Sequence, residues 1–258
     1  MNDREELTER LIELLLCEMP GYRAEAAGFR GGVSRRRLLR SLLNVRPPGA
    51  PAAEFIRLQD ELLSAETAEK GVVDISGLTP AREGIYLWQG DITRLRADAI
   101  VNAANPELLG CFYPCHGCID NAIHSAAGVL LREECAAVMA RQGHPEPPGG
   151  AKVTAAYNLP SKYVIHTVGP VVSGEVTSED EKLLRSCCRS CLEAADGLGA
   201  ASVALPCIST GEYRFPNALA ASITLGEVVR FHGERPEMKI IIDVYRDEDY
   251  EIYRRLLA

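Results

Sequence analysis

The sequence lacks long runs of apolar residues. Its longest candidate, LIELLL at residues 11–16, ends at Cys17 and Glu18, whereas a membrane-spanning helix needs roughly 18 consecutive apolar residues. The first ten residues, MNDREELTER, carry several acidic side chains, which is untypical of a secretory signal or a transit peptide. We therefore expect a cytoplasmic protein that has no membrane partner.

The sequence also has fewer basic than acidic residues. The 258 residues contain 28 Lys and Arg against 36 Asp and Glu, which gives a net charge of −8. Nonspecific nucleic-acid binding needs a basic surface, so we expect no nucleic-acid partner. An anionic small ligand is not excluded, because loop amides and helix N-termini bind phosphate locally.

Two familiar nucleotide-binding signatures are missing as well. The loop ISTGEYRFP, residues 208–216, follows the apolar run SVALPC. It has neither the G-K-[ST] ending of a Walker loop nor the G-x-G-x-x-G of a Rossmann fold. Its Ser209, Thr210 and Gly211 are small, so backbone amides could wrap a phosphate there at the start of a helix. A strand-to-helix loop without a ligand is the alternative.

The chain has no internal repeat and divides into three regions. Residues 1–70 have apolar residues at helical spacing, interrupted by RPPGAPAAEF, and predict three amphipathic helices. Residues 71–84 are polar and contain glycine and proline, which is typical of a linker. Residues 85–258 alternate short β-rich runs with longer helical patterns, and we expect them to form the main domain.

This alternation predicts an α/β fold in which helices flank a sheet. Ligands of such sheets bind outside the carboxyl ends of the strands, and polar or glycine-containing segments follow several of the predicted strands. The predicted strands are IYLWQ, DAIVN, KVTAAYN, YVIHTV, SVALP and KIIIDVY, and the predicted helices cover residues 120–138, 179–198, 216–232 and 248–257.

Two short polar motifs stand at such strand ends. In QGDIT, residues 89–93, Asp91 follows a glycine and Ile92 offers a backbone amide, although a simple Asp turn is the alternative. In NAAN, Asn102 and Asn105 are three residues apart after the strand DAIV. Their carboxamides could face one crevice and hold sugar hydroxyls, with ordinary turn chemistry as the alternative.

Cysteine is abundant, with nine residues in the chain. Cytosolic thiols stay reduced, so clustered Cys and His favour a metal or catalytic site over disulfide bonds. The stretch LLGCFYPCHGCIDNAIH brings Cys111, His116 and Cys118 onto one loop. Three zinc-type ligands leave an open catalytic position, whereas Cys115 could close a structural Cys3His site or form a CxxC redox pair. Cysteines that merely pack together are the remaining alternative.

In this order, the motifs resemble the macrodomain family over residues 85–257. The resemblance is carried by QGDIT, DAIVNAAN, IDNAIH, HTVGP and ISTGEYRFP. GCFYPCHGC stands where most hydrolytic macrodomains have a glycine-rich run. This departure is similar to a zinc-containing branch of the family that also carries N-terminal helices. The resemblance implies a three-layer α/β/α sandwich with a mixed central sheet, preceded by a helical extension in residues 1–70.

The same resemblance implies an activity, the hydrolysis that removes mono-ADP-ribose from modified protein side chains. Some members of the branch are encoded beside sirtuin-type transferases and lipoyl-carrier proteins, so a lipoyl-carrier protein modified in this way is an expected partner. A non-catalytic ADP-ribose-binding module and an O-acetyl-ADP-ribose deacetylase are alternatives that use the same pocket. A zinc-scaffolded interaction protein with active N-terminal helices is a third.

By resemblance, site roles carry over to the matching positions. Zn²⁺ would be the cofactor, bound by Cys111, His116 and Cys118. Tyr245, after the last strand, could stack on adenine. The adenine, diphosphate and distal ribose of ADP-ribose would be held by Asp91, Ile92, Asn102, Asn105, Ser209, Thr210, Gly211, Glu212 and Tyr213.

Asp120 and Asn105 are the predicted catalytic residues. Asp120 lies two residues after Cys118 and could orient or deprotonate a water molecule or fix a ribose hydroxyl. Its structural alternative is an N-cap for the following helix. His124 lies one turn further along the same helical face, and we interpret it as a packing or supporting residue. A bis-thiolate zinc ion would favour clamping of ribose oxygens over activation of water.

Overall fold

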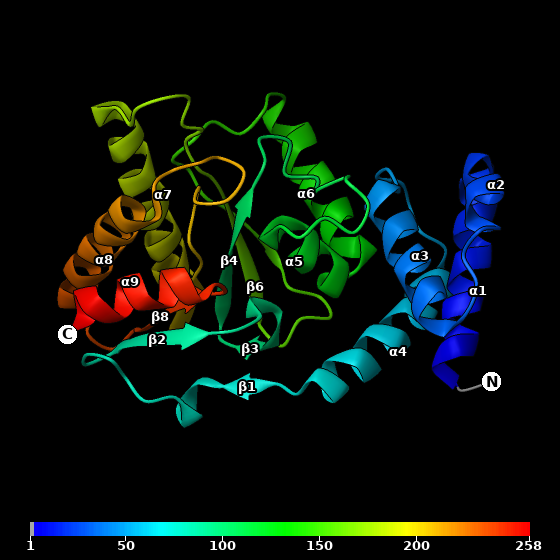
Figure 1. Cartoon of the computed structure of the whole chain (residues 1–258), viewed down its shortest axis with the longest axis horizontal. Helices are drawn as coiled ribbons and strands as arrows, with labels where there is room; N and C mark the ends of the chain where they lie inside the picture. Colours follow the sequence, from blue (N-terminus) through cyan, green and yellow to red (C-terminus); the bar gives the residue numbers. More distant parts are fainter. Residues whose placement is uncertain (1–2) are drawn as a thin grey trace.

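The structure is a computed structural model that describes residues 3–258. Helices occupy most of residues 3–70, and Figure 1 shows them at one end of the molecule. The chain forms the three predicted helices and, in addition, a four-residue helix over Arg23–Ala26. Among the described residues, no helix is both long and apolar enough to cross a membrane. The N-terminal elements are α1 (Asp3–Glu18), the 3-10 turn η1 (Pro20–Tyr22), α2 (Arg23–Ala26), α3 (Gly32–Val45) and α4 (Ala53–Lys70).

The N-terminal helices bury their apolar faces against one another and against the rest of the chain. Each fully buried leucine or phenylalanine contributes about 1.5–3 kcal/mol to folding. Val129, which begins α6 (Val129–Gln142), belongs to the same apolar cluster, so the extension packs on the α/β region. The cluster includes Leu11, Ile12, Leu15, Leu38, Leu39, Leu42, Phe55, Leu58 and Leu62.

Residues 71–84 run from the extension along the lower edge of the molecule in Figure 1. They contain β1 (Val73–Asp74), which pairs in parallel with β3 (Leu95–Arg96). The sequence patterns predicted neither of these two short strands. The 3-10 turn η2 (Ile75–Gly77) follows, and the Asp74 side chain accepts a hydrogen bond of 2.9 Å from the Ser76 amide. The segment is therefore paired with the main domain through β1.

The main sheet has six strands, which are the six predicted from sequence. In spatial order they are β2 (Ile85–Gln89), β8 (Lys239–Val244), β7 (Ser202–Leu205), β4 (Ala99–Ala104), β6 (Tyr163–Val168) and β5 (Lys152–Ala155). All neighbours are parallel except β5 and β6, which are antiparallel. The expected mixed central sheet is confirmed.

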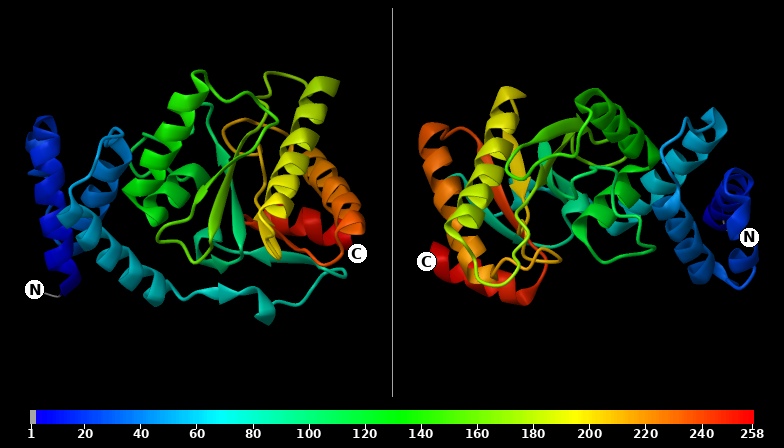
Figure 2. Two further views of the ribbon diagram at one scale, coloured as in Figure 1. Left: turned by 180° about the vertical axis from the view of Figure 1, so that it is seen from behind. Right: turned by 90° about the horizontal axis from the view of Figure 1, so that it is seen from above.

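Helices cover both faces of the sheet, as the two views of Figure 2 show. Alternation along β2 explains why: Ile85 packs into the cluster on one face, and Tyr86 packs into the cluster on the other. The three-layer α/β/α sandwich is thereby confirmed. One face carries α5 (Ile119–Ala127) and α6 (Val129–Gln142), and the other carries α7 (Ser178–Gly197), α8 (Asn217–Glu234) and α9 (Asp247–Leu257).

The single helix predicted over residues 120–138 is wrong, because the chain forms two helices there. The break falls at Gly128, whose φ of +91° lies in the left-handed region that favours glycine. The Gln59 side chain of α4 enters the gap, and its Oε1 accepts a 3.0 Å hydrogen bond from the Val129 amide. Helical periodicity cannot reveal the contact with Gln59, because that residue comes from a distant segment.

Replacing Gly128 by alanine tests the fit of the extension to this break. A Cβ at this position would lie 2.3 Å from Gln59 Nε2 in addition to the unfavourable φ, so Gly128→Ala should lower the free energy of unfolding by about 1–3 kcal/mol. Gly226 lies inside α8, and a Cβ there would have open space around it, so Gly226→Ala should raise the free energy of unfolding by about 0.5–1 kcal/mol. Urea denaturation measures the free energy of unfolding of both variants. Equal changes in the two variants would contradict the proposed fit of Gln59 at Gly128.

Candidate active site

A cleft of about 1030 Å³ opens at the carboxyl ends of the central parallel strands. Loops that follow β2, β4, β7 and β8 form its walls, which is the position expected for a ligand site in an α/β sheet. The cleft brings together every predicted site residue except Asn102. Its predicted lining residues are Asp91, Ile92, Asn105, Cys111, His116, Cys118, Asp120, Ser209, Thr210, Gly211, Glu212 and Tyr213.

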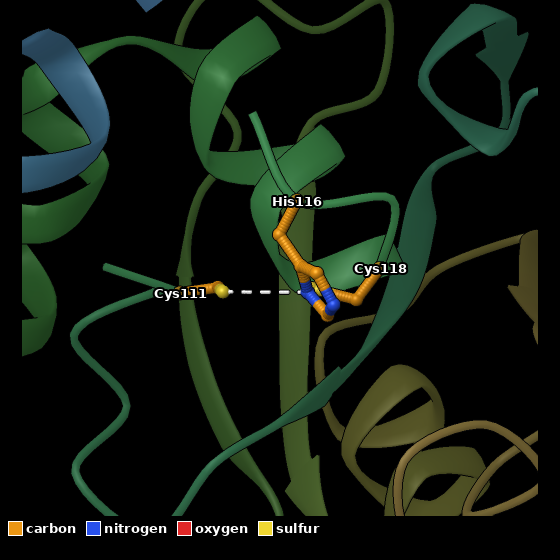
Figure 3. Close-up of side chains that lie close together, drawn as sticks. All are labelled: Cys111, His116 and Cys118. Atoms are coloured by element: carbon orange, nitrogen blue, oxygen red, sulfur yellow. Dashed lines mark hydrogen bonds between the residues drawn. The ribbon is translucent and has the colours of Figure 1, made fainter. Parts of the chain in front are cut away.

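The three predicted metal ligands lie together on one wall. The ligand atoms of Cys111, His116 and Cys118 all lie within 4.8 Å of one another, and the side chains point toward a common centre (Figure 3). Cys111 Sγ is 3.6 Å from His116 Nδ1. Tetrahedral zinc with bonds of about 2.0–2.3 Å holds its ligands about 3.5–4 Å apart. The donor set and its spacing fit a zinc ion with one open position.

Cys115 lies outside this group. Its Sγ is 3.3 Å from Ser41 Oγ and 3.5 Å from the Arg37 carbonyl oxygen, so its thiol faces α3 rather than the other sulfurs. All nine cysteines, each within the described part of the chain, are free thiols. This geometry does not favour the Cys3His alternative or the CxxC disulfide.

Cys118 also starts helix α5. Its Sγ accepts a 3.4 Å hydrogen bond from the Asn121 amide, which makes Cys118 the N-cap. The alternative N-cap role for Asp120 is therefore wrong, because Asp120 already lies in the first turn of the helix. Burial raises the pKa of the Cys118 thiol to about 12, and a bound cation would favour the thiolate and oppose this shift.

Asp120 is the buried carboxyl group of the cleft, with only 4% of its surface exposed. Its Oδ1 accepts a 2.8 Å hydrogen bond from Asn102 Nδ2, and its Oδ2 accepts a 3.2 Å bond from Asn105 Nδ2. Burial raises its pKa to about 6, while the Asn102 bond and the charge of Arg132 act in the opposite direction. A carboxyl held in this way can orient a water molecule or accept a proton.

Asn102 lies beneath the cleft rather than in its wall, so it does not line the ribose position as predicted. The register of β4 and β6 pairs it with His166, and its Nδ2 is 3.1 Å from His166 Nδ1. That nitrogen must accept, because the Asn102 Nδ2 group is a donor. His166 Nε2 therefore carries the proton and donates to Thr154 Oγ1 at 2.9 Å.

A second group of metal-type side chains is fully buried and consists of His124, Cys135 and His166. The tautomer of His166 decides whether this group could bind a cation. His166 Nε2 has no lone pair for a cation, so the group is better explained as packing beneath the site. Burial lowers the pKa of His124 well below its usual value. Its Nε2 lies 3.5 Å from Asp120 Oδ1, but a neutral ring makes no ion pair. The interpretation of His124 as a supporting residue fits this position.

The loop after β7 is the most distinctive backbone feature of the cleft. Ser209 has a φ of +65° and Arg214 a φ of +58°, and the Ser209 carbonyl accepts a 2.9 Å hydrogen bond from the Phe215 amide. Within residues 3–258, the N–H groups of residues 211–213 have no hydrogen-bond acceptor. Unpaired amides on a curved loop suit a bound anion such as a phosphate.

Two acidic side chains that line the cleft, Asp91 and Asp243, lie near each other. Asp91 caps the turn η3 (Ile92–Arg94), where its Oδ1 accepts a 3.0 Å hydrogen bond from the Thr93 amide. Asp91 therefore caps the turn and also lines the cleft. Asp243, in β8, is buried, and its Oδ1 has no hydrogen-bond partner in the described chain. Burial and the nearby Asp91 raise the pKa of Asp243 well above its usual value.

Sequence reasoning missed several residues of the cleft, among them Asp243 and Arg40. Asp243 is the acidic residue that interrupts the apolar run KIIIDV, a signal that could have been noticed. Arg40 lines the cleft from α3, although the extension offered no motif that pointed to the site. Tyr245, for which adenine stacking was considered, lines the cleft with 77% of its surface exposed.

The buried Asp243 gives a test by pH. Its folded pKa is raised, so the native state retains a proton that the unfolded chain releases above about pH 4. Its stabilising contribution is present below about pH 4 and is lost as pH rises through the folded pKa. An amide in its place would not titrate, so the unfolding free energy of Asp243→Asn relative to the wild type should increase from about pH 4.5 to about pH 8. Urea denaturation across this range measures the difference, and a constant value would contradict the assignment.

Comparison with known proteins agrees with the fold and the cleft. A model of the Macro domain family matches residues 101–224. A protein-ADP-ribose hydrolase from Treponema medium is 45% identical over 96% of this chain and 97% of its own length. One from Staphylococcus aureus strain MSSA476 is 43% identical over 84% of this chain and 82% of its own length.

Solved structures show the same likeness. The Trypanosoma brucei macrodomain in complex with ADP-ribose superposes with a TM-score of 0.65 and 32% identity, over 84% of this chain and 95% of that one. Together with the full-length similarity to the Treponema protein, these matches show that the chain belongs to the Macro domain family.

Proposed function

We propose that the protein is a zinc-dependent hydrolase that removes mono-ADP-ribose from modified protein side chains. The observation that carries the proposal is the placement of Cys111, His116 and Cys118 in the same cleft as the buried Asp120. These three side chains are called the metal group below. A carboxyl group beside three metal ligands with an open fourth position has the composition of a hydrolytic site. The names of the Treponema and Staphylococcus relatives support this activity.

The cleft offers a matching group for each part of ADP-ribose. At one end Asp91 is placed to accept a hydrogen bond from the adenine amino group. In the middle, the unpaired amides of residues 211–213 suit the diphosphate. At the other end Asn105 and Asp120 lie next to the metal group, where the distal ribose would bind. The T. brucei complex with ADP-ribose supports this ligand.

The proposed reaction is attack of water on the anomeric carbon of the distal ribose. A bond forms from that carbon to the water oxygen, the bond to the protein side chain breaks, and the water loses a proton. Asp120 is placed to orient the water and accept this proton, through a transition state with oxocarbenium character. Asn105 and Asn102 fix the carboxyl group by their hydrogen bonds. Zinc, when bound, would supply a Lewis acid beside the ribose oxygens.

The protein substrate belongs to the proposal as well. A lipoyl-carrier protein that a sirtuin-type transferase has modified is the substrate that the family resemblance implies. Phe112 and Tyr113 are exposed beside the metal group, so they give the modified protein an apolar surface next to the ribose end of the cleft.

Removal of one metal ligand tests the zinc requirement. Cys118→Ala should lose bound zinc and hydrolysis of a mono-ADP-ribosylated protein, while circular dichroism shows the α/β fold retained. Cys115→Ser is the matched control on the same loop and should keep one zinc ion, because Cys115 faces α3. Metal content by mass spectrometry and release of ADP-ribose are the two readouts.

The same assay separates the competing functions. Wild-type protein is incubated with mono-ADP-ribosylated protein and with O-acetyl-ADP-ribose, each with and without a chelator. Chelator-sensitive release from the protein supports the proposal. Full-rate release by metal-free protein would refute the zinc requirement, turnover of O-acetyl-ADP-ribose alone would indicate a deacetylase, and binding without release would indicate a reader module.

Asp120→Asn tests the carboxyl group without emptying its buried position. The amide oxygen can still accept from Asn102, whereas the amide NH2 group cannot accept from Asn105. The fold should be retained, and the dissociation constant for ADP-ribose should change much less than turnover. Turnover should fall by about 100-fold or more, because the side chain no longer accepts a proton. Single-turnover kinetics and calorimetric titration measure the two quantities, and unchanged turnover would remove Asp120 from the mechanism.

A further inference from the structure

Helix α3 of the N-terminal extension presents a polar face to the metal loop, residues 111–118. Arg37, Arg40, Ser41 and Asn44 follow helical spacing and therefore share one side of the helix. The apolar side of the same helix is separate, with Leu39 and other leucines buried among the N-terminal helices. Helix α3 lies beside α5 (Figures 1 and 2).

The first set of contacts holds Cys115 in the middle of the loop. Asn44 Oδ1 accepts a 2.8 Å hydrogen bond from the Cys115 amide. The Cys115 thiol faces Ser41 Oγ at 3.3 Å and the Arg37 carbonyl at 3.5 Å. Cys115 has a φ of +53°, a region that non-glycine residues adopt only when their surroundings hold them there. The contacts from α3 therefore stabilise a turn that the loop would not favour alone.

The second set passes through Asn121, which is fully buried. Arg40 donates to Asn121 Oδ1 from Nη2 at 2.8 Å and from Nε at 3.2 Å. Asn121 in turn donates from Nδ2 to the carbonyl oxygens of Tyr113, at 3.0 Å, and Cys111, at 3.4 Å. Its backbone amide donates to Cys118 Sγ. One asparagine thus joins both cysteine ligands, and Arg40 fixes its orientation.

Arg40 also reaches the third ligand. Its Nη2 lies 3.5 Å from the His116 carbonyl oxygen, and its side chain forms part of the cleft wall. Arg132 makes a further connection between α3 and the segment that precedes the metal loop. Arg132 donates to the Leu43 carbonyl near the end of α3 and to the Leu109 carbonyl just before the metal loop.

We propose that α3 is a working part of the metal site, with Arg40 and Asn44 as positioning residues that hold the loop in its zinc-binding geometry. The inference rests on the proposed function, in which Cys111, His116 and Cys118 bind zinc. The metal loop has no regular secondary structure, so its ordering would otherwise oppose binding. Contacts behind metal ligands commonly change metal affinity by about 10–100-fold.

Variants of the full-length chain test this role directly. Arg40→Gln and Asn44→Ala should each raise the dissociation constant for zinc by about 10–100-fold, measured by competition with a chromophoric chelator. They should also weaken the thiolate-to-metal absorption of the cobalt-substituted protein. Arg40→Lys keeps the charge but loses the forked geometry, so its affinity should fall between those of the wild type and Arg40→Gln.

Arg36→Gln is the matched control. Arg36 lies on the same helix but pairs with Glu66 of α4, away from the metal loop, so this variant should bind zinc like the wild type. Thermal melts of metal-free Arg36→Gln and Arg40→Gln should agree closely. A loss of zinc affinity confined to the Arg40 and Asn44 variants then cannot come from general destabilisation of the extension.

Three results would overturn the inference or its basis. Wild-type zinc affinity in both Arg40→Gln and Asn44→Ala would show that α3 only packs against the domain. Unchanged zinc affinity with a raised KM in Arg40→Gln would make Arg40 a substrate contact instead of a positioning residue. A wild-type chain that takes up no zinc would refute the proposed function itself, which the other two results leave standing.

Discussion

The cleft depends on the hydrogen bond by which Asn102 holds the buried carboxyl group of Asp120. A buried carboxylate is unfavourable unless donors satisfy it, and Asn102 and Asn105 supply those donors. Asn102 is itself fixed by the sheet, since strand register sets it beside His166. Asp120 lies in the first turn of α5, two residues after the N-cap Cys118. The side-chain amide of Asn102 therefore links the sheet to the first turn of α5, next to Cys118.

Local patterns in the sequence predict most of the fold. Strand length, apolar alternation and turn residues are short-range signals, so all six strands of the main sheet and the helices α7, α8 and α9 could be placed from them. Cys111, His116 and Cys118 share one short loop, so their proximity also followed from spacing alone. The resemblance to macrodomains then placed the remaining motifs around a single cleft, which the structure brings together.

The features that could not be predicted all depend on contacts between distant segments. The break at Gly128 is stabilised by Gln59 of α4, which accepts a hydrogen bond from the Val129 amide. Asn102 lies below the cleft because β4 turns its side chain toward His166, and a sequence motif does not state which face a strand residue takes. Arg40 reaches the site only because the extension packs beside α5. A helical segment with no chemical motif of its own therefore contributes to the wall of the site.

The charge of the cleft bears on how an acidic protein can hold an anionic ligand. Acidic side chains outnumber arginines along its walls, so side-chain charge alone would repel a diphosphate. Two features reduce the repulsion. Burial raises the pKa of Asp243, which favours its neutral form. The amides of residues 211–213 are unpaired, and such amides can bind an anion without carrying a net charge. The charge of a zinc ion among Cys111, His116 and Cys118 would be balanced by the two thiolates, so the ion would act at the distal end by offering its open coordination position to ribose oxygens. Ligand affinity would then depend on backbone shape in the middle of the cleft and on the metal at its end, with little help from long-range attraction.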